Sequence, residues 1–259
     1  MANGLDLGGK VALVTGGNGG IGLGMAEGMA AAGADVVIWG SNPQKNSAAE
    51  EKLRGHGRRV LAQRCDVADE QQVDACFAEA VRKMGRVDAC FANAGVSQAR
   101  SSFHELSTSE WRRVLSVNLD GAFFTLRAAA RHMVERAKGG DKGGRLVGMA
   151  SSAAIHGAAR AQSYAASKGA MVSLIRALAV EMARYGVTAN SILPGWIETE
   201  MTARGIADEK FAGAVLPRIP VRRWGSRQDF AGIAVYLASD ASSYHTGDSF
   251  VIDGAYTIF

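Results

Sequence analysis

The chain has 259 residues, of which 47% are hydrophobic and 21% are charged, and its formal net charge is +4. These proportions are ordinary for a globular protein and argue against intrinsic disorder, and so small a positive excess does not by itself indicate nucleic acid. No apolar run approaches the roughly 18 residues of a membrane helix, and the first ten residues lack the basic start and apolar stretch of a signal peptide.

Short apolar runs alternate with longer helical patterns along the chain. The expected strands are 10–15, 35–39, 59–63, 88–92, 145–149, 188–193 and 249–252, and the expected helices are 21–32, 43–55, 69–84, 107–117, 121–138, 162–185 and 226–239. This alternation is typical of parallel βαβ units with right-handed crossovers. We therefore expect an α/β fold, a Rossmann-type doubly wound sheet of about seven parallel strands with helices on both faces.

Nothing in the sequence divides the chain into parts. It contains no linker, repeat or low-complexity stretch, so residues 1–259 are expected to form a single domain. The one long irregular region is 194–225, which has a possible helix of its own. Loops of that length in compact domains are usually lids or binding loops, so we expect this region to cover a substrate.

The three cysteines, Cys65, Cys76 and Cys90, lack Cys-x-x-Cys spacing. Such a set argues against a disulfide framework or a zinc site and favours buried thiols in a reducing cytoplasm. We therefore expect a cytoplasmic protein with no metal site, no membrane span and no nucleic acid partner.

A glycine-rich segment, Thr15-Gly-Gly-Asn-Gly-Gly-Ile-Gly22, lies between the first expected strand and the first expected helix. Glycines there permit a tight turn and let backbone N–H groups approach a pyrophosphate, which the N-terminus of the helix also attracts. In this strand–turn–helix context the segment is a strong indication of dinucleotide binding. The expected contacts are Gly16, Asn18, Gly20, Ile21 and Gly22.

Other polar or glycine-containing segments also follow strands, and they are expected to meet at one edge of the sheet. The expected cofactor contacts among them are Ser41, Asn42, Asp66, Val67, Asn93, Ala94, Gly95, Pro194 and Gly195. An acid after the second strand would bind the ribose 2′-hydroxyl of NAD, but none is present there. Ser41 and Asn42 can donate hydrogen bonds to a 2′-phosphate, so NADP is slightly favoured over NAD.

Tyr164 and Lys168 are four residues apart on the longest expected helix and therefore share one of its faces. A neighbouring ammonium stabilises a phenolate and lowers the pKa of the phenol, which suits proton transfer to or from a carbonyl oxygen. Ser151 ends the preceding strand, where its hydroxyl can bind the same oxygen. Asn118 lies between two expected helices, where it can bond a backbone group or a water near Lys168. Taken alone, a Tyr-x-x-x-Lys pair is more often an ordinary surface pair.

Together these motifs resemble the classical short-chain dehydrogenase/reductase family. The resemblance covers about residues 7–254 and rests on the order and spacing of Thr15-Gly-x-x-x-Gly-x-Gly22, Asp66, Asn93-Ala-Gly95, Asn118, Ser151, Tyr164-x-x-x-Lys168, Pro194-Gly195 and Asp253-Gly254. Two positions depart from the family pattern. Ala92 replaces the commoner Asn, and Gly19 stands where NADP-binding members usually carry Arg. Ser152 follows Ser151 directly, so a one-residue misalignment between these two serines is open.

The resemblance implies a single dinucleotide-binding catalytic domain that transfers a hydride between NAD or NADP and a secondary alcohol or its ketone, such as a sugar, polyol or similar small carbonyl. It makes Tyr164 the acid/base. Lys168 lowers the pKa of Tyr164 and holds the nicotinamide ribose, Ser151 orients the substrate, and Asn118 supports a water relay. It also places Ile197 and Thr199 against the nicotinamide carboxamide. It further implies a homotetramer built through helices 121–138 and 162–185.

Two other functions stay open. One is 3-oxoacyl-acyl-carrier-protein reductase. A basic strip of Arg127, Arg131 and Lys138, interrupted by Glu135, would dock an acidic carrier in such an enzyme, but a strip of this kind is more often an ordinary solvated helix face. The other is a catalytically idle dinucleotide-binding sensor or scaffold, against which the intact Ser/Tyr/Lys set argues. His156 either lines the substrate pocket or is an ordinary loop histidine. Trp196 either faces the substrate or is a packing anchor for the long loop.

Overall fold

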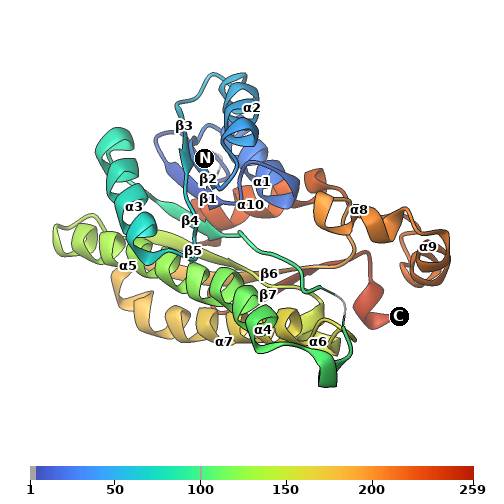
Figure 1. Ribbon diagram of the computed structural model, residues 1–259. Coiled ribbons are helices and arrows are strands. Elements are labelled where there is room, and N and C mark those ends of the chain that lie inside the picture. The colour runs from blue at the N-terminus through green and yellow to red at the C-terminus, as the bar shows by residue number, and fades with distance from the viewer. Residues whose placement is uncertain (1–3, 100) are drawn as a thin grey trace.

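The computed structural model describes residues 4–99 and 101–259, and it is built around one seven-stranded parallel sheet (Figure 1). The strands run in the order β3-β2-β1-β4-β5-β6-β7. Their bounds are β1 Val11–Thr15, β2 Asp35–Gly40, β3 Val60–Arg64, β4 Ala89–Ala92, β5 Gly144–Met149, β6 Val187–Pro194 and β7 Ser249–Ile252. The order reverses between β1 and β4, the position at which such sheets bind ligands beyond the carboxyl ends of their strands.

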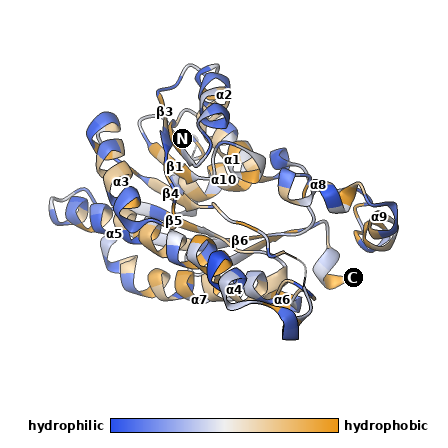
Figure 2. Ribbon diagram, viewed as in Figure 1, coloured by the Kyte–Doolittle hydropathy of each residue, from blue (hydrophilic) through white to orange (hydrophobic). Residues whose placement is uncertain are grey.

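Helices cover both faces of the sheet, so its central strands are buried throughout. The main helices are α1 Gly20–Ala31, α2 Pro43–Arg54, α3 Glu70–Met84, α4 Thr108–Leu115, α5 Gly121–Lys138, α7 Gln162–Met182 and α10 Ala231–Ala238. Side chains alternate along β1: Ala12 and Val14 pack towards α1 and α10, whereas Leu13 packs towards α3, α5 and α7. The strands and α7 carry many hydrophobic residues, whereas α2 at the periphery is mostly hydrophilic (Figure 2).

The predicted fold class is confirmed, and the structure adds elements that local patterns did not predict. Helices α4 and α5 are joined by a π-helical segment, Ser116–Asp120, so Asn118 lies inside a continuous helix instead of between two. A short helix, α6 (Ala153–His156), precedes α7. The expected helix 226–239 starts as a 3-10 helix, Arg227–Phe230, before α10 begins.

The irregular region 194–225 contains two short helices, α8 (Glu200–Ile206) and α9 (Glu209–Val215). They lie to one side of the sheet, on the side of the C-terminus (Figure 1). Trp196 packs edge-on against Phe211 of α9, with ring centroids 5.0 Å apart, and Phe211 stacks on Trp224. This aromatic packing holds the region together, so Trp196 serves as a packing anchor.

Candidate active site

The glycine-rich turn is closed so tightly that two of its glycines, Gly17 and Gly22, have no room for a side chain. A Cβ on Gly22 would overlap the carbonyl oxygen of Gly16 and lie 2.5 Å from Asn93 Nδ2, and Gly16 has a φ of +64°. A Cβ on Gly19 would meet nothing within 4 Å, and no side chain caps the N-terminus of α1 there. The turn thus offers free space and a helix N-terminus, which fits a pyrophosphate.

The ends of β1 and β4 are tied together beside this turn. Thr15 Oγ1 accepts hydrogen bonds from the backbone N–H groups of Asn93 (3.0 Å) and Ala94 (2.9 Å), and Asn93 Nδ2 donates to the Thr15 carbonyl oxygen at 2.8 Å. Asn93 therefore holds the shape of the cradle with its side chain. This network places Asn93, Ala94 and Gly95 next to Gly16, as their positions after parallel strands predict.

No acidic side chain follows β2 directly; Ser41 and Asn42 are both exposed there. The Oδ1 atom of Asn42 caps α2 by accepting from Lys45 N–H at 3.0 Å, so the amide nitrogen of Asn42 is left to donate. Asn18 Nδ2 donates to Asn46 Oδ1 at 2.7 Å, which fastens the glycine-rich turn to α2. Lys45 forms an ion pair with Glu200 of α8, so α8 reaches the same end of the site.

In the turn that follows β3, the strand next to β2, Asp66 is exposed and Val67 is buried against α5. The Oδ1 atom of Asp66 accepts from Ala68 N–H at 3.0 Å, which shapes the turn between β3 and α3. The side chain of Asp69 caps α3. Asp66 and Val67 thus stand after the strand next to β2, where the adenosine end of a dinucleotide is expected.

Tyr164, Ser151 and Lys168 come together at the carboxyl end of β5. Tyr164 is in the first turn of α7, and its hydroxyl forms a hydrogen bond with Ser151, which follows β5. The ammonium of Lys168 lies 5.6 Å from the centroid of the Tyr164 ring and donates to the Met149 carbonyl oxygen at 2.7 Å. Of the two neighbouring serines, Ser151 makes the contact with Tyr164.

The expected lowering of the Tyr164 pKa by Lys168 is not found in this structure. Burial raises the pKa of Tyr164 above its ordinary value of 10, and the hydrogen bond with Ser151 offsets this only in part. Burial also lowers the pKa of Lys168, from 10.5 to about 8. Desolvation therefore outweighs the attraction between the two side chains, and Tyr164 holds its proton at neutral pH.

The low pKa of Lys168 predicts a measurable pH dependence of stability. Between about pH 8 and the ordinary lysine pKa of 10.5, the unfolded chain binds a proton at Lys168 that the folded chain does not. The free energy of unfolding should therefore rise with pH in this window in the wild type, relative to Lys168→Met, in which the group is missing. Urea unfolding of both proteins without cofactor at pH 7.5, 8.5 and 9.5 checks this. The same dependence of the free energy of unfolding on pH in the two proteins would contradict this prediction.

Asn118 connects the π-helical segment to the loop after β4. Its Oδ1 accepts from Val96 N–H at 2.8 Å, and its Nδ2 donates to the Val96 carbonyl oxygen at 3.0 Å and to Ser167 Oγ at 3.2 Å. A Cβ on Gly95 would lie 3.3 Å from Asn118 Oδ1 and 3.6 Å from Lys168 Nζ. The π-helical turn thus directs Asn118 to a backbone group close to Lys168.

Gln98 has a positioning role that the sequence did not reveal. It is buried, and its Oε1 accepts from the backbone N–H (2.8 Å) and hydroxyl (2.6 Å) of Ser163, the residue before Tyr164. Its Nε2 donates to the carbonyl oxygen of Arg160 at 3.3 Å. Gln98 therefore fixes the start of α7, and no local motif marks it, because its partners are more than sixty residues away.

The segment after β6 leads from the sheet towards the glycine-rich turn. Gly195 N–H donates to the Ile252 carbonyl oxygen at 3.0 Å, and Ile197 is buried. Thr199 is the N-cap of α8, and a Cβ on Gly20 would lie 3.3 Å from its methyl carbon. Pro194, Gly195, Ile197 and Thr199 thus follow one path from β6 to the cradle.

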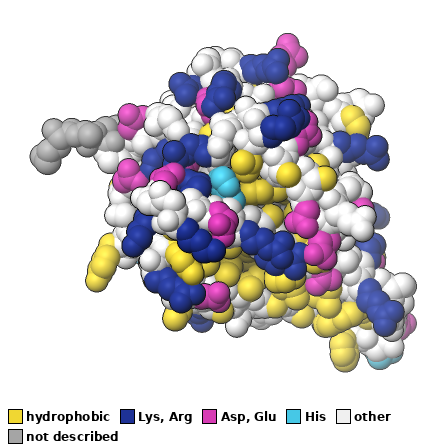
Figure 3. Space-filling model, turned by 90° about the vertical axis from the view of Figure 1, so that its left-hand side faces the viewer, with side chains coloured by type: hydrophobic (Ala, Val, Ile, Leu, Met, Phe, Trp, Pro, Cys, Tyr) yellow, Lys and Arg dark blue, Asp and Glu magenta, His cyan; other side chains and the backbone are white. Residues whose placement is uncertain are grey.

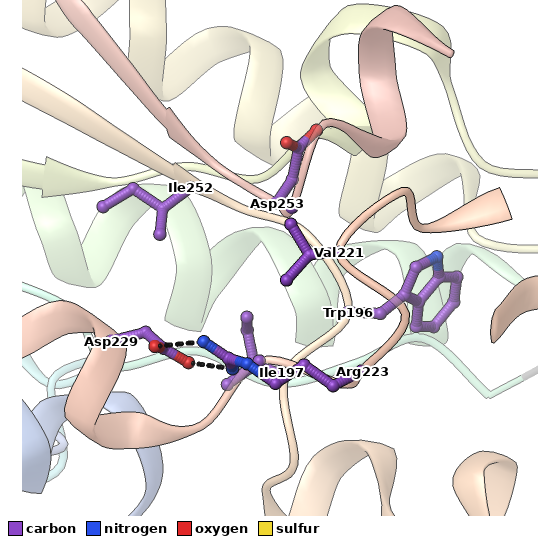
Figure 4. Close-up of a pocket in the computed structure, with 9 residues that line it drawn as sticks. Trp196, Ile197, Val221, Arg223, Asp229, Ile252 and Asp253 are labelled. Carbon is purple, nitrogen blue, oxygen red and sulfur yellow. Dashed lines mark hydrogen bonds and ion pairs between the residues drawn. The ribbon is translucent and has the colours of Figure 1, made fainter. Parts of the chain in front are cut away.

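A cavity of about 210 Å³ lies behind this segment, between Trp196, Val221 and Asp253 (Figure 4). One wall is the ion pair of Arg223 with Asp229, with contacts of 2.7 and 2.8 Å. Ser151, Tyr164 and Lys168 do not line it, so it is separate from the catalytic group. His156 packs edge-on against Tyr256, and the guanidinium of Arg218 lies 4.7 Å from the centre of the Tyr256 ring.

A doubly wound parallel sheet, a glycine cradle at its switch point and a Ser–Tyr–Lys group at the same edge define a dinucleotide-dependent oxidoreductase. Comparison with known proteins agrees. A family model described as Enoyl-(Acyl carrier protein) reductase matches residues 16–257. The chain is 37% identical to 2-dehydro-3-deoxy-D-gluconate 5-dehydrogenase from Dickeya dadantii, over 99% of this chain and 98% of that one.

Two further relatives cover the full chain as well. The 3-oxoacyl-[acyl-carrier-protein] reductase from Chlamydia pneumoniae is 34% identical, over 98% of this chain and 99% of that one. The crystal structure of a gluconate 5-dehydrogenase from Burkholderia cenocepacia in complex with NADP and tartrate superposes with a TM-score of 0.91 at 34% identity, over 98% and 97% of the two chains. The chain belongs to the classical short-chain dehydrogenase/reductase family. It is an NAD(P)-dependent enzyme that acts on secondary alcohols and their ketones.

Proposed function

We propose that this enzyme interconverts a keto group and a secondary hydroxyl group on a sugar acid, with NADP(H) preferred. The observation that carries the proposal is the hydrogen-bonded pair of Ser151 and Tyr164 with Lys168 one helical turn away, beside a cradle that fits a dinucleotide. The sugar acid follows from the names of relatives that span the whole chain.

In the proposed mechanism Tyr164 is the proton donor for ketone reduction and the proton acceptor for alcohol oxidation. Its raised pKa keeps it protonated at neutral pH, which is the form that donates to a developing alkoxide. Ser151 bonds the Tyr164 hydroxyl, so its own hydroxyl lies within reach of the same substrate oxygen. The bound nicotinamide supplies or accepts the hydride. Lys168 positions the nicotinamide ribose and, when protonated, stabilises the phenolate that Tyr164 leaves behind.

Asn118 and Gln98 act in this proposal as positioning residues. Asn118 holds the Gly95–Val96 backbone against Lys168, and Gln98 holds Ser163 and thereby the start of α7. Neither touches the hydroxyl of Tyr164 in the structure. The amide groups of both side chains are buried and hydrogen-bonded. Loss of either side chain therefore leaves a buried partner unpaired and lowers the free energy of unfolding by about 1–3 kcal/mol.

The NADP(H) preference depends on Ser41 and the amide nitrogen of Asn42, which directly follow β2, where no acidic side chain is present. Ser41→Asp should shift preference towards NAD(H), because a carboxylate repels the 2′-phosphate and binds the 2′-hydroxyl instead. Calorimetric titration of both cofactors into wild type and variant measures the shift. Ser47→Asp, an exposed serine on α2, is the matched control. A wild type that strongly prefers NAD(H) would reverse the assignment.

The substrate class is tested with three ketones of matched reactivity: a keto-sugar acid, a neutral keto-sugar of the same chain length, and a 3-oxoacyl thioester. We expect the highest kcat/KM for the acid. Activity confined to the thioester would establish the carrier-protein reductase instead. The basic strip that such a reductase would use is largely neutralised here, because Arg127 pairs with Glu70 and Lys138 pairs with Glu135. No turnover with any of them, despite cofactor binding, would favour the sensor or scaffold.

We also propose a homotetramer that assembles through α5 and α7. An apolar groove runs between these helices, and its hydrophobic lining includes Phe123, Leu126, Val134, Leu174 and Leu178. The face on the left of Figure 1 shows broad hydrophobic areas crossed by charged side chains (Figure 3). Closed symmetric assemblies bury self-complementary patches of this kind.

Ala177 tests this interface without disturbing the monomer. It is exposed on α7, three residues from Leu174 and next to Leu178. Ala177→Glu places an unpaired charge in the proposed interface and should dissociate the tetramer into smaller species at micromolar concentration. Light scattering measures this, and Ala48→Glu on the exposed face of α2 is the control. A wild-type species of the 27.1 kDa chain mass would refute the assembly.

A cytoplasmic location is part of the same proposal. It is supported by three free cysteines, which a reducing compartment preserves. No helix within the described residues is long and apolar enough to span a membrane.

A further inference from the structure

Two thiols meet between β3 and α3, away from Tyr164. Cys65 directly follows β3 and is buried, and Cys76 is on α3 and partly exposed. Gln63 and Cys65 are two residues apart along an extended backbone, so their side chains point to the same face, towards α3. Accordingly, Gln63 Nε2 donates to the Cys76 carbonyl oxygen at 3.1 Å, and Cys76 Sγ lies 3.6 Å from the Arg64 carbonyl oxygen.

The two sulfur atoms are themselves hydrogen-bonded to each other. This bond makes the two thiols unequal, because it lowers the pKa of Cys76 while the pKa of the buried Cys65 is raised. Cys76 is therefore both the more accessible thiol and the one that more readily becomes a thiolate, which is the reactive form. Cys90 is a natural contrast: it is fully buried, and burial raises its pKa to about 12.

We propose that Cys65 and Cys76 form a reversible disulfide when the protein meets a hydroperoxide, and that this cross-link weakens cofactor binding. The Cys76 thiolate attacks one oxygen of hydrogen peroxide and breaks the O–O bond. This gives a sulfenic acid on Cys76 and a hydroxide that is protonated to water. Cys65 then attacks the Cys76 sulfur and the S–O bond breaks. The leaving hydroxide takes the Cys65 proton, so two thiols lose two electrons and one peroxide becomes two waters.

The link to the cofactor site follows from the position of Cys65 in the chain. It immediately precedes Asp66, whose backbone N–H donates to Gln72 Oε1 of α3 at 3.2 Å. A disulfide brings the two sulfurs to about 2.05 Å, much closer than a hydrogen-bonded contact, so the end of β3 and α3 must shift towards each other. Asp66 and Val67 lie in the turn between them. The predicted effect of the disulfide on cofactor binding rests on the proposed cofactor role of Asp66 and Val67.

The first test measures the bond itself and does not depend on any activity. The reduced full-length protein is treated with graded hydrogen peroxide, remaining thiols are alkylated, and peptides are mapped by mass spectrometry. We expect a Cys65–Cys76 peptide that dithiothreitol releases, with Cys90 still alkylated after denaturation. Cys90→Ser should behave as wild type. Cys65→Ser should stop at a sulfenic acid on Cys76 that dimedone traps. Alkylation of both Cys65 and Cys76 after peroxide, or a link that includes Cys90, would overturn the proposal.

The second test measures cofactor affinity. NADPH fluorescence titration of the oxidised and re-reduced wild type should show a several-fold weaker affinity after oxidation, and peroxide should have no such effect on Cys76→Ser. If the disulfide forms and affinity is unchanged, the regulatory step is wrong while the thiol pair stands. If the reduced protein binds no dinucleotide at all, the proposed function fails instead. Should Cys76→Ser fold poorly, recovery of the oxidised wild type by dithiothreitol provides the same comparison.

Discussion

Turnover of the Tyr164→Phe variant is expected to fall by at least about a hundredfold, the lower end of what a general acid or base contributes. The substitution removes the hydroxyl that bonds Ser151 and leaves the ring in place beside Lys168. Cofactor affinity should therefore change little while the chemical step is lost. Steady-state kinetics in both directions, together with cofactor titration, separate the two effects.

Tyr244→Phe is the matched control for this variant, because Tyr244 is fully exposed and loses the same single oxygen. It should keep wild-type kinetics. Wild-type turnover in Tyr164→Phe would remove Tyr164 from the mechanism. An equal loss of turnover and of cofactor affinity would instead indicate that the hydroxyl serves to bind the cofactor.

The Gly22→Ala variant is expected to lose at least about tenfold in dinucleotide affinity, which corresponds to roughly 1.4 kcal/mol. The added Cβ would overlap the Gly16 carbonyl oxygen and lie 2.5 Å from Asn93 Nδ2. The Gly16 backbone is held at a φ of +64°, and Asn93 Nδ2 is bonded to Thr15, so neither partner can retreat without reshaping the cradle. Overpacking of this kind also lowers the free energy of unfolding, by about 1–3 kcal/mol.

Gly232→Ala on α10 provides the comparison, because a Cβ there meets nothing within 4 Å. It should bind cofactor as the wild type does and should unfold at the same temperature or a higher one. Fluorescence titration and thermal unfolding of both variants distinguish a local effect on the cradle from a general cost of replacing glycine in a helix. Undiminished cofactor affinity in Gly22→Ala would show that the turn does not hold the pyrophosphate.

The fold class and the order of its main elements were predictable from sequence because they depend on local patterns. Runs such as Val11–Val14 are apolar throughout, as strands buried on both faces must be, and Gly33 and Gly85 mark the ends of helices. The candidate catalytic residues were predictable for a related reason. Tyr164 and Lys168 share a helix face by spacing alone, and Ser151 follows a parallel strand whose end faces the same edge of the sheet.

What only the tertiary structure decided involves contacts between distant segments or the degree of burial. The choice of Ser151 over Ser152 required knowing which hydroxyl faces α7. The π-helical turn at Asn118 and the buried Gln98 have partners elsewhere in the chain, and Arg127 is neutralised by Glu70 of α3. The direction of the Tyr164 pKa shift depended on desolvation, which spacing does not report. The meeting of Cys65 with Cys76 likewise arises because a strand and the helix after it pack together, and the linear order of residues contains no measure of that distance.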